Sequence, residues 1–459
     1  MEQRTRTPAR DWRDTPLVHV LSPMQRFIHN ETASGIVLIV ATVVALALAN
    51  SPLAQQYDAL LHAKVGIEAG PFVLRETVGH WINDGLMALF FFLVGLELKR
   101  EALVGELANP RQALLPVLAA IGGAVLPAII YTLFNLGGPG APGWGVPMAT
   151  DIAFALGVLA LLGSRVPWAL KVFLTAVAVI DDLLAVLVIA LFYTSDLNLG
   201  VLGIGLGVLA LLVVINLLGI RALPVYVVLG LLVWLAFLES GVHATLAGVL
   251  VALTIPARNR IDQEHFLSRA YGLLEQFRQG NPVGTQMLTD ERQEQAVLDL
   301  EDACEAVQAP LQKLEHQLQP WIAFGVMPIF ALANAGVALS AQGLSGESLP
   351  VMLGIVVGLV LGKPIGLFVA TWLTVRLGIA QLPQGVTWRH IAGVGCLAGL
   401  GFTMSLFIAT LGFEATVGLL AAAKLGILAA SLVAGLIGYT ALRFVAPVAD
   451  PQPAPAVSS

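Results

Sequence analysis

The chain has 459 residues, of which 57% are hydrophobic and only 12% are charged, and its formal net charge is −6. Soluble domains carry about 25% charged residues, so this composition excludes an ordinary soluble protein and favours a chain embedded in lipid. The acidic balance argues against a nucleic-acid partner. The two cysteines, Cys304 and Cys396, lie in a polar and an apolar stretch, which argues against a disulfide between them.

Apolar runs predict the membrane spans. Residues 1–32 are rich in arginine and contain no apolar run of signal-peptide type, so we expect a retained cytoplasmic arm. From residue 33 onward, runs recur that suit a bilayer core about 30 Å thick, which needs roughly 20 residues per helix. Between the first two runs, Lys64 to Arg75 predicts a short hairpin with a turn at Gly70-Pro71. The runs predict an all-α polytopic membrane protein with about twelve transmembrane helices at 33–49, 78–98, 112–134, 145–163, 168–193, 200–220, 223–238, 241–256, 320–340, 349–375, 390–411 and 417–442.

A polar segment divides the predicted spans into two groups. Spans 1–8 occupy 33–256, the polar segment occupies 257–319, and spans 9–12 occupy 320–442. Apolar residues recur at helical spacing in the polar segment, which predicts a solvated cytoplasmic helix pair, with a regulatory role as the alternative. The tail 443–459 is rich in Pro, Ala and Ser and is predicted to be disordered and cytoplasmic.

Basic residues indicate the orientation of the spans. Lys and Arg precede span 1 and follow every even-numbered span, which is typical of cytoplasmic loops. The opposite connections hold acidic residues or no Lys or Arg, except for 50–77, where Lys64 and Arg75 lie beside acidic residues. Both termini are therefore predicted to face the cytoplasm.

Four charged residues are expected in the middle of predicted spans, where each costs roughly 2.5 to 3.5 kcal/mol on insertion scales and needs a partner or a function. Asp181 and Asp182 lie near the centre of span 5, Lys363 near the centre of span 10, and Asp151 in span 4. Neighbouring helical residues point about 100° apart, so one carboxylate of the pair can contact Lys363 while the other faces a hydrated cavity and binds a cation. The alternative is a structural ion-pair cluster.

Two predicted spans are interrupted, at Met148–Asp151 and at Ala398–Thr403. Paired interruptions in the two halves of a chain predict an inverted-repeat transporter with two broken, crossed helices, here spans 4 and 11. Gly399 and Gly401 fit such a break, although close helix packing uses glycines as well.

Polar residues at the interruptions suit the ends of broken helices. Asp151 can offset the positive ends of the half-helices, and the hydroxyl groups of Thr150 or Thr403 can lend oxygen atoms.

A set of charged and titratable residues lies near the ends of predicted spans. They are Glu97, Arg100, Glu101, Glu315, His316 and His243. Glu97, Arg100 and Glu101 have the i, i+3, i+4 spacing of one helix face, and ordinary surface pairing explains them as well. As a histidine, His243 has the titration range that a pH switch needs, although a hydrogen-bonded structural histidine at the interface is an equally good interpretation.

Together these motifs resemble the NhaA family of sodium/proton antiporters over nearly the whole chain. The segments that carry the resemblance are Phe90–Glu101, Ala149–Gly157, Ile180–Asp182, Ser240–Gly248, Ala331–Gly336, Gly362–Pro364 and Gly399–Met404. Paired interrupted spans are themselves a known feature of this family. One turn after His316, Gln319 stands where the family pattern can carry a second histidine.

The resemblance implies electrogenic exchange of Na⁺ or Li⁺ for more than one H⁺, activated at alkaline pH, by an inner-membrane homodimer. It implies that Asp182 is the leading ion ligand, with Asp181 as its partner and the companion of Lys363. Thr150 and Asp151 would belong to the broken helices. The residues Glu97, Arg100, Glu101, Glu315 and His316 would sense pH.

Competition for one site explains how such an exchange is coupled, because a carboxylate holds a proton or a sodium ion but poorly holds both. The transported ion would be held transiently between Asp181 and Asp182, without a cofactor, and the cluster would titrate as a coupled unit. Three other functions fit the sequence less well. A symporter for an organic anion would need a mid-span Arg, which is not present, and an intramembrane aspartyl protease would need aspartates on two facing helices, whereas Asp181 and Asp182 lie on one. A channel would not need Lys363 to balance the charge of the aspartates.

Overall fold

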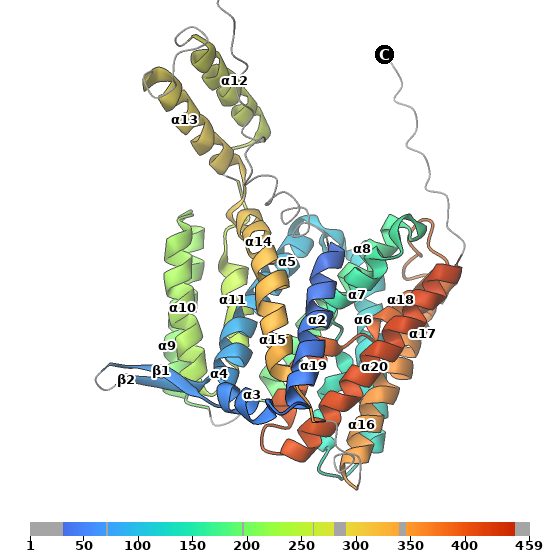
Figure 1. Cartoon of the computed structure of the whole chain (residues 1–459). Helices are drawn as coiled ribbons and strands as arrows, with labels where there is room; N and C mark the ends of the chain where they lie inside the picture. Colours follow the sequence, from blue (N-terminus) through green and yellow to red (C-terminus); the bar gives the residue numbers. More distant parts are fainter. Residues whose placement is uncertain are drawn as a thin grey trace, which may run out of the picture. The chain divides into compact units, whose positions relative to one another are not determined.

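The computed structural model describes residues 31–69, 72–194, 197–259, 261–279, 291–338 and 346–445. The predicted Gly70-Pro71 turn, nearly all of the arm 1–32 and most of the tail 443–459 lie outside the described residues. The described chain is mainly helical with one two-stranded sheet (Figure 1). It forms two compact units. The first comprises Met1–Asn83, Pro110–Val188 and Pro320–Ser459, and the second Asp84–Asn109 and Ile189–Gln319.

Tight helix packing characterises the first unit. A Cβ atom on Gly122 or Gly366 would overlap the backbone of the other helix, so these glycines let α6 and α17 approach closely. Strands β1 and β2 pair antiparallel with Ala69 opposite Phe72, which confirms the predicted hairpin. The elements of this unit are α2 Glu31–Ala49, α3 Ala54–Leu61, β1 Lys64–Ala69, β2 Phe72–Thr77, α4 Val78–His80, α6 Pro110–Phe134, η4 Ala141–Met148, α7 Ile152–Ala160, η5 Gly163–Arg165, η7 Ile322–Val326, α15 Met327–Asn334, α16 Ser348–Val357, η9 Gly358–Gly362, α17 Lys363–Arg376, α18 Trp388–Ala398, α19 Phe402–Gly412 and α20 Val417–Phe444.

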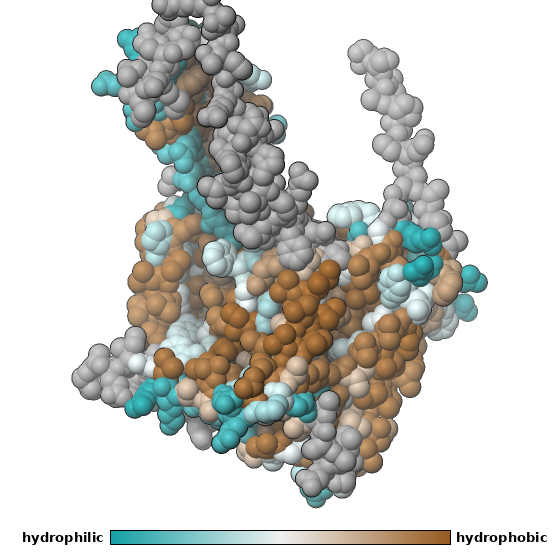
Figure 2. All heavy atoms as spheres, in the orientation of Figure 1, coloured by the Kyte–Doolittle hydropathy of each residue, from teal (hydrophilic) through white to brown (hydrophobic). Residues whose placement is uncertain are grey.

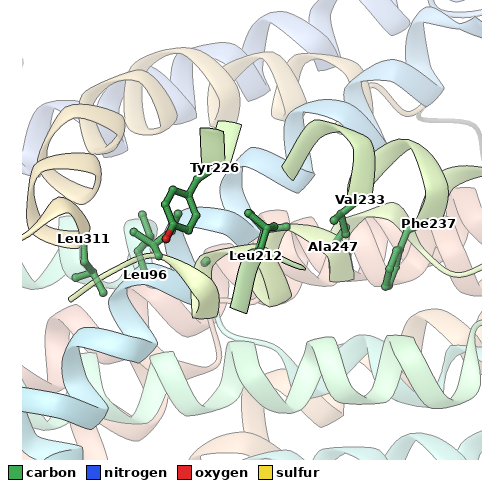
Figure 3. Packing of buried hydrophobic residues seen from close by; sticks show 10 residues of the cluster. Leu96, Leu212, Tyr226, Val233, Phe237, Ala247 and Leu311 are labelled. Atoms are coloured by element: carbon green, nitrogen blue, oxygen red, sulfur yellow. The ribbon is translucent and has the colours of Figure 1, made fainter. Parts of the chain in front are cut away.

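The second unit has its own hydrophobic core, formed by residues such as Leu96, Tyr226 and Phe237 (Figure 3). Lys99 donates from Nζ to the carbonyls of Leu253 and Ile255, at 2.6 and 2.5 Å, and so places a cation at the negative end of α11. The elements of this unit are α5 Met87–Val104, η3 Glu106–Ala108, α9 Leu199–Leu217, α10 Leu223–Ser240, α11 Ala244–Thr254, α12 Gln263–Gln279 and α13 Glu291–Val307. The division between the units falls within η2 Trp81–Leu86 and α8 Trp168–Phe192, and within α14 Pro310–Trp321.

Local sequence sets several helix ends. The side chain of Asn198 accepts hydrogen bonds from the backbone N–H groups of Gly200 and Val201, which begins α9. Helix α10 ends at Gly241, whose φ of 81° lies in the left-handed region that favours glycine.

Within the described residues, eight helical segments are long and apolar enough to cross a membrane, or up to ten if each of two bent pairs is one span. Their exposed surfaces are hydrophobic over much of the view in Figure 2, and α9, for example, exposes Leu199 and Leu217. The chain is therefore a multi-pass membrane protein. The eight segments are Val78–Val104, Pro110–Phe134, Ala141–Ala160, Trp168–Phe192, Leu199–Leu217, Leu223–Ser240, Ser348–Arg376 and Val417–Phe444, and the bent pairs are Ala33–Ala49 with Ala54–Leu61 and Trp388–Ala398 with Phe402–Gly412.

Two of the twelve expected spans do not meet this measure. The run 241–256 yields α11, which has only 11 residues. The run 320–340 begins inside helical structure that starts at Pro310. The count of twelve therefore stays a prediction. In the polar segment, α12 and α13 pack against each other as two helices, and their cytoplasmic location stays a prediction.

Candidate functional site

Both predicted interruptions occur in the first unit as short non-helical segments. Residues 149–151 separate η4 from α7, and residues 399–401 separate α18 from α19, whose axes differ by 44°. The two segments are in contact, because the backbone N–H of Asp151 donates to the carbonyl of Leu400 at 2.6 Å. Each interruption leaves helix-end N–H and C=O groups that need partners inside the protein. That the two broken helices cross stays a prediction.

Asp151 lies at the positive ends of two half-helices. Its Oδ1 accepts from the backbone N–H of Phe154 at 3.0 Å, which caps the start of α7. Its Oδ2 accepts from the backbone N–H of Thr403 at 3.1 Å, at the start of α19, and also from the Thr403 hydroxyl. One buried carboxylate thus offsets the dipoles of α7 and α19. The structure brings Asp151 to Thr403.

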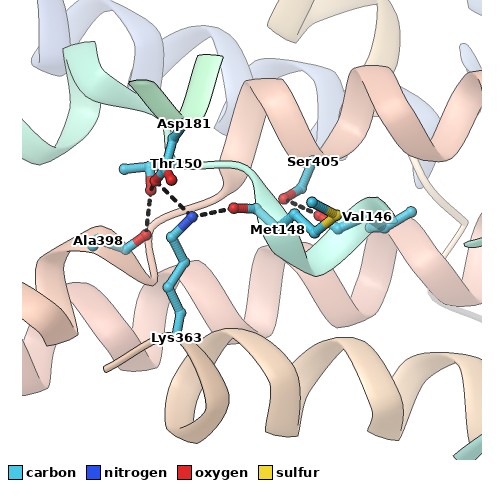
Figure 4. Close-up of polar contacts among 7 residues, drawn as sticks. All are labelled: Val146, Met148, Thr150, Asp181, Lys363, Ala398 and Ser405. Atoms are coloured by element: carbon cyan, nitrogen blue, oxygen red, sulfur yellow. Dashed lines mark hydrogen bonds and ion pairs between the residues drawn. The ribbon is translucent and has the colours of Figure 1, made fainter. Parts of the chain in front are cut away.

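The negative ends of the broken helices receive donors from other elements (Figure 4). The carbonyl of Met148, at the end of η4, accepts from Lys363 Nζ. The carbonyl of Val146 accepts from Ser405 Oγ at 2.7 Å. A lysine cation at a helix carboxyl end is favoured by the helix dipole, so Lys363 and Asp151 act on opposite ends of the same break.

A fully buried ion pair lies beside these ends. Lys363 Nζ is 2.7 Å from Asp181 Oδ2, and both side chains are 0% exposed. Thr150 Oγ1 lies 2.7 Å from the same Asp181 oxygen and 2.8 Å from the carbonyl of Ala398. Asp181 Oδ1 is buried and has no hydrogen-bond partner among the described residues. Asp182, the next residue, is also buried, at 1% exposure. Of the two acids, Asp181 is the one that pairs with Lys363.

The backbone before Lys363 is distorted. Residues Gly358–Gly362 form a π-helical turn, and Pro364 follows Lys363 without a backbone N–H to donate. Such turns are frequent at functional sites. Gly399 has an ordinary φ of −69°, but a Cβ atom there would overlap the carbonyl of Leu359 in this turn. A Cβ atom on Gly401 would likewise overlap Ser405 Oγ. Close packing against backbone therefore requires Gly399, whereas the contact at Gly401 is with the end of a rotatable side chain.

Four of the predicted pH-sensing residues lie together in the second unit. Arg100 Nε is 2.9 Å from Glu315 Oε1, and an Arg100 terminal nitrogen is 3.0 Å from Glu101 Oε1. Glu97 interacts electrostatically with the same three side chains. We call Glu97, Arg100, Glu101 and Glu315 the acid–arginine cluster.

Burial raises the pKa of Glu315 above its ordinary value, against the opposing charge and hydrogen bond of Arg100. Glu101 raises this pKa further, and His316 acts in the lowering direction. Glu315 Oε2 is buried without a hydrogen-bond partner among the described residues. Its ionisation is therefore held in balance by residues on α5 and α14.

His243 contacts a residue outside the acid–arginine cluster. Its Nε2 is 2.6 Å from the carbonyl of Tyr193, to which it can only donate. That contact fits the satisfied-histidine interpretation, and a pH-switch role for His243 stays a prediction.

This chain is similar in sequence to known sodium/proton antiporters. The family model described as "Na+/H+ antiporter 1" matches residues 25–442. A Na(+)/H(+) antiporter NhaA from Koribacter versatilis is 48% identical over 97% of this chain and 96% of its own length. One from Oleidesulfovibrio alaskensis is 50% identical over 96% of this chain and 97% of its own length. The chain belongs to the NhaA family of Na⁺/H⁺ antiporters. Membership in this family implies a transporter rather than an enzyme.

The NhaA-type motifs do not mark every group at the site. The carbonyls of Met148 and Ala398 and the hydroxyl of Ser405 take part in it, although backbone oxygens have no residue signature and a lone Ser in an apolar helix is common. Lys424, near the start of α20, is a further charge in an apolar helix that the sequence reasoning did not single out. Its signal was present, because a single Lys interrupts an apolar run from Val417 to Ala430.

Proposed function

We propose that this chain is an electrogenic, pH-regulated antiporter that exports Na⁺ or Li⁺ in exchange for protons, by alternating access at Asp181 and Asp182. The observation that carries the proposal is the fully buried Lys363–Asp181 ion pair at two contacting helix interruptions. A buried ion pair is weak evidence for stability, because the desolvation cost rivals the attraction. Its presence beside a second buried carboxylate is better explained by ion exchange.

The site can exchange ions because its charge is not balanced. Asp181, Asp182 and Lys363 together carry a formal charge of minus one when all are ionised. One bound Na⁺ neutralises the site, whereas two bound protons leave it at plus one. Exchange of one Na⁺ for two protons would therefore move net charge across the membrane, as the electrogenic proposal requires.

We assign Asp182 as the leading cation ligand and Asp181 as the acid that alternates between Lys363 and a proton. Asp151 was expected among the ion ligands, but its oxygens accept from helix-end donors, which supports a role in holding the interruptions together. Twelve spans with crossed interruptions remain part of the proposal. So do an inner-membrane homodimer with cytoplasmic termini and the acid–arginine cluster as its pH sensor.

Proton flux in sealed vesicles tests the proposal. With the full chain reconstituted, Na⁺ or Li⁺ added at several alkaline pH values should drive proton movement, and K⁺ serves as a comparison cation. Asp182→Asn should reduce Na⁺-driven proton movement to background because the variant cannot exchange a proton for a cation at this position. Asp299→Asn, at a half-buried position of α13 outside the proposed ion site, is the matched control and should retain full flux. Full Na⁺-driven flux in Asp182→Asn would refute the assignment.

A further inference from the structure

Helix α12 has two apolar faces, and one of them is left uncovered by the described part of the chain. The covered face carries Leu273, which is buried, and α12 packs against α13 (Figure 1). The other face carries Leu267, Tyr271 and Leu274, which are 43%, 71% and 53% exposed. Helix α12 is rich in charged residues and is not among the candidate membrane spans, so burial in lipid does not explain this second face.

The exposed face has the spacing of a seam between two helices. Its residues Glu264, Leu267, Tyr271, Leu274 and Arg278 follow one another at intervals of three, four, three and four. This alternation places all five on one side of the helix and is the pattern by which two helices pack along their length. Scattered exposed apolar residues need no explanation. A regular stripe of them with a charge at each end is typical of a surface that pairs with another helix.

The charged ends of this seam indicate which helix pairs with it. Glu264 stands at the start of the seam and Arg278 at its end, each seven residues from Tyr271. A second α12 that runs antiparallel brings Glu264 of one copy next to Arg278 of the other, at both ends of the contact. A parallel pair would instead oppose two glutamates and two arginines, which is unfavourable. The seam is therefore complementary to itself in one orientation only.

The remaining charges of the helix pair are compatible with this contact. Arg278 Nε is 3.3 Å from Glu275 Oε2 within α12, but both side chains are exposed, and such pairs contribute little. Arg278 can therefore turn toward another copy at small cost. Helix α13 is less suited to face its own copy, because like charges on its outward surface would repel each other. The acidic residues exposed there are Glu291, Glu294, Glu301, Asp302 and Glu305.

We propose that α12 is a contact between two copies of this chain, in which the seam from Glu264 to Arg278 packs antiparallel against the same seam of the second copy. Leu267, Tyr271 and Leu274 form the apolar centre of the contact, and the Glu264–Arg278 pairs close its two ends. Two copies with the same orientation in a membrane are related by a two-fold axis along the membrane normal. The paired helices would therefore lie across that axis, with Tyr271 near it.

The contact is short and needs the two copies to be held together. Its two heptads are fewer than the three or four that indicate a free-standing coiled coil. The inference therefore rests on the proposed homodimer, in which other contacts give the second α12 a high effective concentration. It goes beyond that proposal by naming a surface outside the NhaA-type motifs and outside the ion site.

Cross-linking of single-cysteine chains tests the contact. Cys304→Ser and Cys396→Ser first remove the two native thiols, and the full chain is kept in membranes. Tyr271→Cys should then give a cross-linked dimer with a short bismaleimide. Gln276→Cys, which is exposed on the far side of α12, is the matched control and should remain monomeric. No dimer from Tyr271→Cys, or equal dimer yields from the two positions, would overturn the proposal.

Mixing two variants in the same cysteine-free background tests the orientation. Chains with Glu264→Cys and chains with Arg278→Cys should cross-link when they are co-expressed, and neither should cross-link when expressed alone. Cross-linking of Glu264→Cys chains with one another would show a parallel pair and would overturn the proposal. Glu264→Arg should lower the dimer yield of Tyr271→Cys, and adding Arg278→Glu should restore it, because the ion pairs form again with their signs reversed.

These measurements separate the contact from the proposed function. A chain with the mass of two copies that cross-links nowhere on α12 would keep the homodimer and overturn the contact. Absence of Na⁺-driven proton flux in the parent chain would refute ion exchange, whereas the cross-linking yield is measured independently of flux. If Tyr271→Cys does not accumulate in membranes, Leu274→Cys replaces it with the same expected results.

Discussion

The stability lost on removing Lys363 should depend on whether the Asp181 carboxylate is still present. Lys363→Met deletes the cation but leaves Asp181 buried at 0% side-chain exposure, and it takes the donor from the Met148 carbonyl. Breaking a buried ion pair from one side typically destabilises by about 3–5 kcal/mol, because it leaves an uncompensated charge. The double variant Lys363→Met with Asp181→Asn removes both charges. Replacement of a whole buried pair by neutral groups is often neutral or stabilising, so the double variant should be more stable than Lys363→Met alone.

Thermal unfolding of the full chain in detergent measures this order. The melting temperature should fall most in Lys363→Met and recover in the double variant, and the gap should be widest at high pH, where ionised carboxyls are favoured. The gap between the two should shrink at acidic pH, because protonation of Asp181 removes the stranded charge. Equal losses in the single and double variants at every pH would refute the reasoning, since neutralising Asp181 would then relieve no stranded charge.

Two further predictions concern helix packing and pH. Gly399→Ala should destabilise the chain by about 1–3 kcal/mol, because the new Cβ atom overlaps the Leu359 carbonyl, whereas Gly207→Ala in α9 meets open space and should not; thermal unfolding of the two variants compares them, and equal melting temperatures would contradict the close-packing role. Since burial raises the pKa of Glu315 in the folded chain, its proton stabilises the fold at low pH, and this benefit is lost as pH rises from the unfolded pKa through the raised folded pKa. Glu315→Gln should therefore gain stability relative to the parent as pH rises above the pKa that Glu315 has in the unfolded chain. Unfolding measured across pH tests this, and a pH-independent difference between the two chains would contradict the assignment.

The sequence best predicts site residues whose type is unusual for the segment that contains them. Asp181 and Lys363 are charges in apolar runs, and the membrane cost of a charge makes them conspicuous. That one of the two neighbouring aspartates can pair with Lys363 also followed, because these charges lie at the midpoints of their spans, whereas only the family resemblance indicated Asp181. Arg100 and Glu315 are separated by 215 residues, and only the family resemblance connected them in advance.

The parts that sequence misses are those made by backbone and by packing. The Ala398 and Met148 carbonyls become site atoms because helices end there, and any residue would supply the same oxygen. The predicted span at 241–256 lacks support for a similar reason. Hydropathy reports composition and not the length of the helix that forms, and α11 has only 11 residues. The π-helical turn before Lys363 is a further example, because Pro364 lacks a backbone N–H there but does not by itself specify such a turn.

The two interruptions are held together by groups of opposite charge. Asp151 serves the positive ends of α7 and α19, and Lys363 serves the negative end of η4 while it also pairs with Asp181. Any event that changes the charge of Asp181 therefore changes the balance on Lys363 and so on the end of η4. Through Thr150 the same event reaches the end of α18. On the proposed function, ion binding at Asp181 would therefore be coupled to the geometry of both interruptions, which would give a local site a physical means of biasing a larger rearrangement.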